Sequence, residues 1–139
     1  MATINTISVL LNTGDVSGAG TDGDVYVGIG GREFHVDTSA DDFERNSSRT
    51  YVLGQGANIE NATFNDPRKP QVFVEELDQF PVYIRFNPRT RDDNWNVVRV
   101  EITINGATFP RYQSLLEEEG GIWMGIRSGL VFYPRKHID

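Results

Sequence analysis

The sequence contains no cysteine, only two histidines and no long apolar run. Without cysteine the chain can form no disulfide and carry out no thiolate chemistry, and its redox compartment stays open. Residues 1–15 include no basic segment, and their apolar run is too short for a signal peptide or a membrane span. We therefore expect a cytoplasmic protein by default, although a domain cut from a longer exported chain would look the same.

Basic residues are also scarce, with 13 Lys and Arg against 20 Asp and Glu and a net charge of −7. Because nucleic-acid phosphates attract a basic surface, this balance argues against nucleic acid as a partner. The length of 139 residues predicts a single domain, 1–139, with its own core, and we expect a monomer. The content of glycine, phenylalanine and tyrosine favours strands and turns over helices.

The excess negative charge is confined to the first third of the chain. Residues 1–44 hold eight acidic residues and one basic residue, Arg32, and the acids and bases of residues 45–139 balance. Like charges at this density repel one another unless something neutralises them. These acids lie in loop sequence rich in Gly, Thr and Ser, which favours a cation site over a solvated acidic face.

Alternating apolar residues predict about eight short strands and hence an all-β, antiparallel β-sandwich. The expected strands include 4–12, 24–30, 32–37, 49–53, 81–87, 95–105 and 129–133. Tight hairpin turns are expected at residues 30–31 and at Asn105–Gly106. Residues 72–77 fit either a strand or a short helix, and residues 112–119 are expected to form one or two helical turns.

Several motifs in residues 18–23 can be set aside. GAGTDG matches the dinucleotide-binding pattern GxGxxG, but a strand pattern follows it where that motif needs a helix. It also resembles one nonapeptide of a calcium-binding β-roll, which requires tandem copies. The spacing of an EF-hand is absent.

A calcium site of another kind is predicted from two loops that an intervening hairpin returns to one edge. Calcium takes six to eight oxygen ligands, including backbone carbonyls, which a glycine-rich loop presents freely. The first loop offers Thr21 and Asp22, and the second offers Asp37, Asp41 and Asp42. Zinc fits less well because it prefers His or Cys ligands.

Two neighbouring features have simpler interpretations. His35 lies in a predicted strand, opposite the apolar positions, and we expect it to be exposed rather than a ligand. Asp92 and Asp93 form a third acidic pair, which could instead neutralise Arg89 and Arg91.

Candidate catalytic groups are few. With no cysteine, two histidines and no G-x-S-x-G motif, the sequence predicts a protein that is not an enzyme.

Three segments resemble the PLAT domain family, also called LH2. Residues 13–31 read TGDVSGAGTDGDVYVGIGG, which is similar to the family's opening motif. Residues 33–54 resemble its next segment, and residues 84–102 resemble the later one, in which an acidic loop precedes a tryptophan-led strand. The family includes the C2-like C-terminal domain of clostridial alpha-toxin phospholipase C and domains of lipoxygenases and lipases. The resemblance implies two four-stranded sheets with calcium bound by loops at one end.

The resemblance also implies a ligand set. It comprises the carbonyl of Gly20 together with Thr21, Asp22, Asp37, Asp41, Asp42, Asp92 and Asp93. Two positions depart from the pattern. Gly18 stands where the toxin domain has an acid, and the loop 87–94 carries two arginines where membrane-docking relatives have exposed aromatic residues, which argues against insertion into lipid. Trp95 is expected in the core, and Trp123 could be buried or exposed.

Three functions are consistent with these observations. The first is a non-enzymatic, calcium-binding module that binds anionic lipid headgroups at a membrane surface or binds a protein partner. The second is a targeting or regulatory domain of a lipid-modifying enzyme, such as a lipase, phospholipase or lipoxygenase, whose catalytic part lies elsewhere. The third is a metal-free structural or stress-related interaction module.

Overall fold

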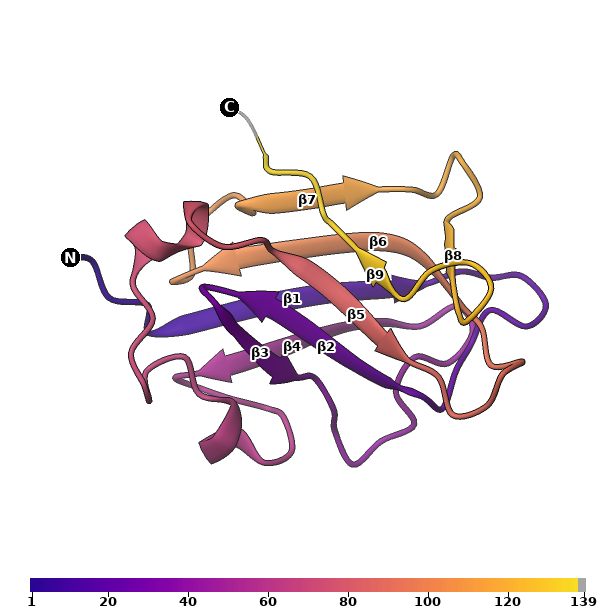
Figure 1. Cartoon of the computed structure of the whole chain (residues 1–139), viewed down its shortest axis with the longest axis horizontal. Coiled ribbons are helices and arrows are strands. Elements are labelled where there is room, and N and C mark those ends of the chain that lie inside the picture. The colour runs from indigo at the N-terminus through magenta and orange to yellow at the C-terminus, as the bar shows by residue number, and fades with distance from the viewer. Residues whose placement is uncertain (138–139) are drawn as a thin grey trace.

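A computed structural model describes residues 1–137, which fold into two packed antiparallel sheets (Figure 1). The strands are β1 (Thr6–Thr13), β2 (Asp24–Ile29), β3 (Arg32–His35), β4 (Ser48–Gly54), β5 (Tyr83–Asn87), β6 (Trp95–Ile104), β7 (Tyr112–Leu115), β8 (Ile122–Met124) and β9 (Val131–Phe132). Two short 3₁₀ helices, η1 (Ala62–Asn65) and η2 (Val74–Asp78), interrupt the chain between β4 and β5. The predicted all-β, antiparallel β-sandwich is confirmed.

The larger sheet has the order β4-β1-β6-β7, with β8 also paired to β6. The smaller sheet has the order β3-β2-β5-β9. The expectation of two four-stranded sheets is therefore wrong by one strand, because β8 adds to the first sheet through the pairing of Met124 with Trp95. The sequence pattern missed β8 because it is only three residues long and follows two glycines.

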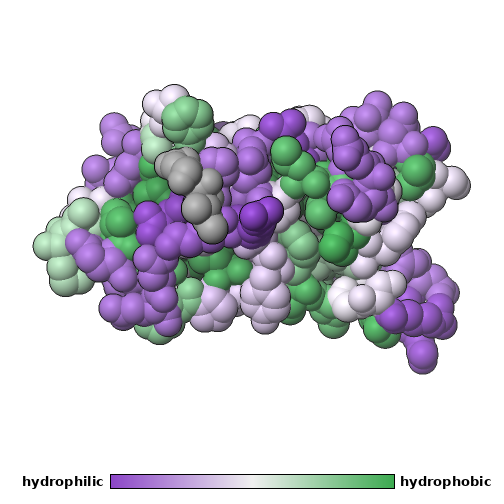
Figure 2. Space-filling view, turned by 90° about the horizontal axis from the view of Figure 1, so that it is seen from above, coloured by the Kyte–Doolittle hydropathy of each residue, from purple (hydrophilic) through white to green (hydrophobic). Residues whose placement is uncertain are grey.

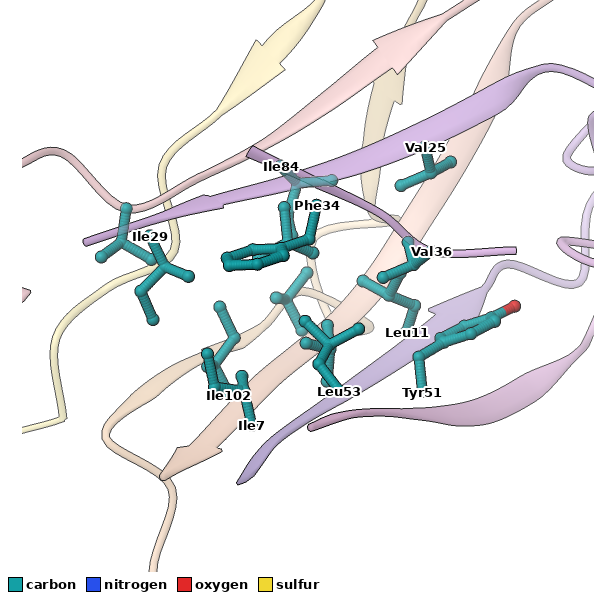
Figure 3. Close-up of a cluster of buried hydrophobic side chains, with 14 of the residues drawn as sticks. Ile7, Leu11, Val25, Ile29, Phe34, Val36, Tyr51, Leu53, Ile84 and Ile102 are labelled. Carbon is teal, nitrogen blue, oxygen red and sulfur yellow. The ribbon is translucent and has the colours of Figure 1, made fainter. Parts of the chain in front are cut away.

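The core lies between the sheets and follows the predicted period of two. Along β1 every second residue is buried, so that Ile7, Val9 and Leu11 face the other sheet. Figure 3 shows Phe34 and Ile84 of the smaller sheet pointing into the same cluster. Trp95 is fully buried, as predicted, and its Nε1 donates a hydrogen bond to Oγ1 of Thr13 over 2.9 Å.

Three local predictions are wrong or incomplete. Residues 112–119 form no helical turns; β7 begins there, because Tyr112 and Ser114 alternate inward against β6. The Asn105–Gly106 turn is present, with φ of 53° and 65°. However, the next strand begins only at Tyr112, so the connection is longer than a two-residue hairpin. Residues 72–77, left open between strand and helix, contain most of η2.

Three long connections meet at one end of the sandwich, on the right in Figure 1. They run from β1 to β2, from β3 to β4 and from β5 to β6. Hydrogen bonds join them: Thr21 N–H donates to Phe43 O over 3.0 Å, and Oγ1 of Thr21 donates to Oδ1 of Asp93 over 2.6 Å. The N-terminus lies at the opposite, left-hand end, and the described C-terminal end lies at the top of the view, left of centre. We call this meeting place of connections the loop end.

Candidate functional site

At the loop end, acidic side chains surround a polar pocket of about 230 Å³. The residues contributing carboxylates to its lining are Asp22, Asp24, Asp37, Asp41 and Asp42. Asp22 lies in the first connection, Asp24 begins β2, and the other three lie in the second connection, which the β2–β3 hairpin returns to the same edge. The basic side of the lining comes from His35 and Arg89. We call this cavity the acidic pocket.

Asp42 is the buried anchor of the pocket. Its carboxylate accepts hydrogen bonds from the N–H of Thr38 over 2.8 Å, from Oγ1 of Thr38 over 2.9 Å and from the hydroxyl of Tyr51 over 2.9 Å. Arg49 Nη1 lies 3.6 Å away. These contacts fix the turn of the second loop, so the primary role of Asp42 in this structure is to hold that loop in shape.

Asp37 lies beside this anchor and is harder to ionise than an ordinary aspartate. Partial burial raises the pKa of its carboxyl group, and a hydrogen bond with the Asp42 carboxyl raises that pKa further. Two carboxyl groups at such close range resist carrying two negative charges. A cation in the pocket would relieve this repulsion and favour the charged form of Asp37.

His35 is less exposed than predicted, since only 28% of its side chain is accessible. Its ring stacks on Tyr26 with centroids 4.8 Å apart, and its Nε2 lies 3.2 Å from Oδ1 of Asp24. The imidazole therefore faces one of the pocket acids.

The predicted ligands Thr21 and Asp93 lie side by side, but they bind each other instead of facing the acidic pocket. Oγ1 of Thr21 donates to Oδ1 of Asp93 over 2.6 Å and accepts from the N–H of Gly23 over 2.9 Å. The other Asp93 oxygen accepts the N–H of Arg89 over 2.8 Å. These oxygens tie the first loop to the β5–β6 connection. Gly20 packs so closely on the second loop that a Cβ there would come within 2.8 Å of Arg45 N.

Asp92 lies away from the pocket, with 83% of its side chain exposed, and pairs with Nη1 of Arg127 over 3.2 Å. Asp22 and Asp41 are exposed at the pocket rim. The structure thus gathers Asp22, Asp37, Asp41 and Asp42 in one cavity and places the remaining predicted ligands in a neighbouring loop network.

The donor chemistry of the acidic pocket suits a hard cation such as calcium, because oxygen atoms dominate it. The side chains are not preassembled around one point, however. Within residues 1–137, no three His, Cys, Asp or Glu side chains are positioned to hold a metal ion together. Ligation would require the exposed Asp22 and Asp41 to turn inward, with backbone carbonyls or water completing the shell.

A second surface feature surrounds Trp123, whose exposure the sequence left open. After β8, the chain turns at residues 125–129, where the Gly125 N–H donates to Gly129 O over 3.0 Å. Trp123 and Ile126 are 39% and 49% exposed around this turn. The Arg127–Asp92 pair places the turn beside the loop 87–94. The sequence feature that could have indicated this exposed turn is GIWMGIRSG, in which large apolar residues lie between glycines.

The face shown in Figure 2 is mixed, with hydrophobic patches among hydrophilic side chains. Leu130, Val131 and Tyr133, next to this turn, are each at least 40% exposed. Arg89, Arg91 and Arg127 are also exposed nearby. Apolar and cationic groups are therefore adjacent at the loop end. No helix within residues 1–137 is long and apolar enough to cross a membrane.

Neither a family model nor a curated protein matches this chain. Solved structures do share its fold. An alpha-toxin from Clostridium absonum superposes over 95% of this chain with 24% identity and a TM-score of 0.64. An alpha-toxin of Clostridium perfringens from an avian strain superposes over 96% of this chain with 21% identity and a TM-score of 0.67.

An engineered lipoxygenase, LOX, covers 93% of the chain with 19% identity and a TM-score of 0.58. This chain spans only 31% and 32% of the two toxins and 16% of that lipoxygenase, so it corresponds to one part of each. At these identities the comparisons establish the fold alone.

Proposed function

We propose that this chain is a non-enzymatic module that binds calcium in the acidic pocket and docks, through the loop end, on an anionic membrane surface. The observation that carries the proposal is the juxtaposition of the pocket with an exposed apolar turn and three arginines. The shared fold with parts of a toxin and a lipoxygenase is compatible with a module attached to lipid-directed enzymes.

Asp22, Asp37 and Asp41 would hold the ion, with backbone carbonyls of the pocket or water completing the shell. When bound, calcium supplies positive charge and open coordination positions for an anionic headgroup. Asp42 keeps the second loop in shape through its bonds to Thr38 and Tyr51. Asp37 must be ionised to bind the ion, and its raised pKa means that a proton competes with calcium for its carboxyl group.

The turn after β8 would supply the apolar contact. Burying the exposed parts of Trp123 and Ile126 in the lipid interface contributes roughly 1–3 kcal/mol. Each arginine near an anionic surface adds about 1 kcal/mol. The three arginines of the loop end therefore give weak binding by themselves, which calcium would strengthen by cancelling the negative charge of the acidic pocket.

A second candidate is a targeting or regulatory domain of a lipid-modifying enzyme whose catalytic part lies elsewhere. It is favoured by the short share of the toxin and lipoxygenase chains that this chain spans. In that case the loop end would still bind the membrane, and another face would contact the catalytic part. A protein partner at the loop end and a metal-free interaction module are the competing outcomes.

The test is thermal melting in chelator, in calcium and in magnesium. A ligand that binds only the folded state at a hundredfold excess over its Kd adds about 2.7 kcal/mol. For a domain of this size that raises Tm by several degrees. We expect a calcium-selective rise that Asp22→Asn largely removes. Glu44→Gln, an equal charge change at an exposed position of the second loop, should keep the rise. Equal melting in all three buffers would refute calcium binding.

A further inference from the structure

Strand β4 is the longest strand at an edge of either sheet. It has seven residues, whereas β3 and β7 have four each, β8 has three and β9 has two. β4 pairs with β1 on one side, and within residues 1–137 no strand lies on its other side. An edge strand presents backbone N–H and C=O groups to which another chain can add a strand. A long edge of this kind therefore needs protection.

The features that usually protect an edge are missing from β4. Natural edge strands commonly carry an exposed lysine, a proline or a bulge. The pairing of β4 with β1 runs over all seven residues without a shift in register. Its one charged residue, Arg49, lies 3.6 Å from Asp42. The outward positions Ser48, Thr50 and Val52 are uncharged, so the sequence of β4 suits the addition of a further strand.

A single asparagine occupies this edge instead. Oδ1 of Asn58 accepts the N–H of Val52 over 2.8 Å, and its Nδ2 donates to Thr50 O over 2.9 Å. The backbone N–H of Asn58 also donates to Val52 O over 3.3 Å. A side-chain amide carries the same kinds of donor and acceptor as a peptide group. Asn58 therefore makes the hydrogen bonds that the backbone of a neighbouring strand would make, and it ends the sheet at this point.

The backbone holds Asn58 in this position. Gly54 and Gly56 have φ of 89° and 75°, and their turn brings the chain back along β4, where Ala57 N–H donates to Gly54 O over 3.2 Å. Ile59, which follows Asn58, is 8% exposed and belongs to the core. The turn on one side and the buried isoleucine on the other thus fix the amide against the edge.

The same connection also covers the edge of the smaller sheet. Asn65 of η1 is buried, and its Oδ1 accepts the N–H of His35 in β3 over 2.7 Å. η1 lies against both β3 and β4, as Figure 1 shows at the lower left. We call residues 55–66 the edge cap. Strand β3 is short and carries Arg32 and Glu33 as additional protection, so β4 depends more strongly on the cap.

We infer that the β4 edge is a latent docking surface for a second copy of this chain, and that the side chain of Asn58 keeps it closed. Two β4 edges can pair antiparallel about a twofold axis, so that each supplies the donors and acceptors that the other needs. The uncharged outward side chains of β4 add no like-charge repulsion to such a pair. The two larger sheets would then join into one continuous sheet. This surface is separate from the acidic pocket.

The test is sedimentation equilibrium of the wild type and Asn58→Ala, in chelator so that calcium cannot bridge two copies. Protein concentrations run from micromolar to millimolar. We expect the wild type to remain a monomer, and the mean mass of Asn58→Ala to rise with concentration toward twice that of the monomer. Amide hydrogen exchange of dilute protein gives a second readout. The N–H of Val52 should exchange about tenfold faster in Asn58→Ala, because its acceptor is lost.

Two further variants separate loss of the cap from loss of stability. A double variant, Asn58→Ala with Thr50→Lys, also lacks the amide but places a charge on the exposed side of β4, and it should remain a monomer. Ile102→Val weakens the core in β6 and leaves the edge intact, so it should also remain a monomer. A monomeric Asn58→Ala at millimolar concentration would overturn the inference. So would a dimeric wild type, or self-association of either control variant.

Discussion

Removing the carboxylate of Asp42 should destabilise the protein even when no calcium is present. In Asp42→Ala, the N–H and hydroxyl of Thr38 and the hydroxyl of Tyr51 lose a charged acceptor. Hydrogen bonds to charged groups contribute about 1.5–3 kcal/mol each. Relief of the repulsion between Asp42 and Asp37 offsets part of this loss, so we expect a net decrease of roughly 2–4 kcal/mol. That corresponds to a Tm lower by about 10 °C.

The assay is urea unfolding in chelator, with the midpoint and slope compared between the wild type and Asp42→Ala. Tyr51→Phe is the matched variant, because it removes one of the three donors and should cost about 1.5–3 kcal/mol, the contribution of one such hydrogen bond. A loss below about 1 kcal/mol for Asp42→Ala in chelator would refute the anchoring role. If the full loss appeared only when calcium was present, Asp42 would be a ligand rather than an anchor.

Two further predictions concern the same end of the fold. Asp37 has a pKa raised above the ordinary value of 3.8. Its stabilising contribution is therefore complete below that value and is lost as the pH rises through the folded-state pKa. In chelator at neutral pH, Asp37→Asn should accordingly be more stable than the wild type, and this difference in stability should vanish in acid. Urea unfolding midpoints measured across pH test the prediction. A difference in stability that does not change with pH would contradict it. Gly23→Ala should destabilise by about 1–3 kcal/mol because its Cβ would lie 2.7 Å from Asn87 O. Gly18→Ala meets no atom within 4 Å but has φ of +77°, and should cost about 1 kcal/mol. Equal unfolding midpoints for the two glycine variants would refute the steric argument.

The strands could be predicted because buried and exposed residues alternate along each of them. Ile7, Val9 and Leu11 alternate with polar or half-buried residues, and this local pattern alone fixes which face is buried. Tyr112 and Ser114 show the same alternation, but four residues are too few to separate a strand from a helical turn. In that segment the pairing with β6, a long-range contact, decides the outcome.

The acidic pocket could be anticipated for a different reason. A hairpin with two glycines at its turn must return the chain to the edge it left, so Asp22 and Asp37 had to approach each other. Their separate roles could not be anticipated. Whether a carboxylate faces a cavity, as Asp37 does, or bonds a neighbouring loop, as Asp93 does, depends on side-chain partners up to 72 residues away.

Trp123 and Ile126 illustrate the remaining limit. Met124, which lies between them, is buried and pairs with Trp95 of β6. The brevity of β8 leaves the flanking residues exposed beside the loop 87–94. The absence of aromatic residues in that loop argued against contact with lipid, and the neighbouring turn supplies the apolar surface that the loop itself lacks.

Co-sedimentation with vesicles tests the central claim most directly. Vesicles with and without phosphatidylserine are mixed with the protein in calcium or in chelator. We predict binding that needs both phosphatidylserine and calcium, and a strong loss of it in a Trp123→Ser, Ile126→Ser double variant. Phe64→Ser, which alters an apolar side chain that is 82% exposed in η1, away from the loop end, should bind as the wild type does. Binding that is equal in calcium and chelator, or unchanged in the double variant, would contradict the account.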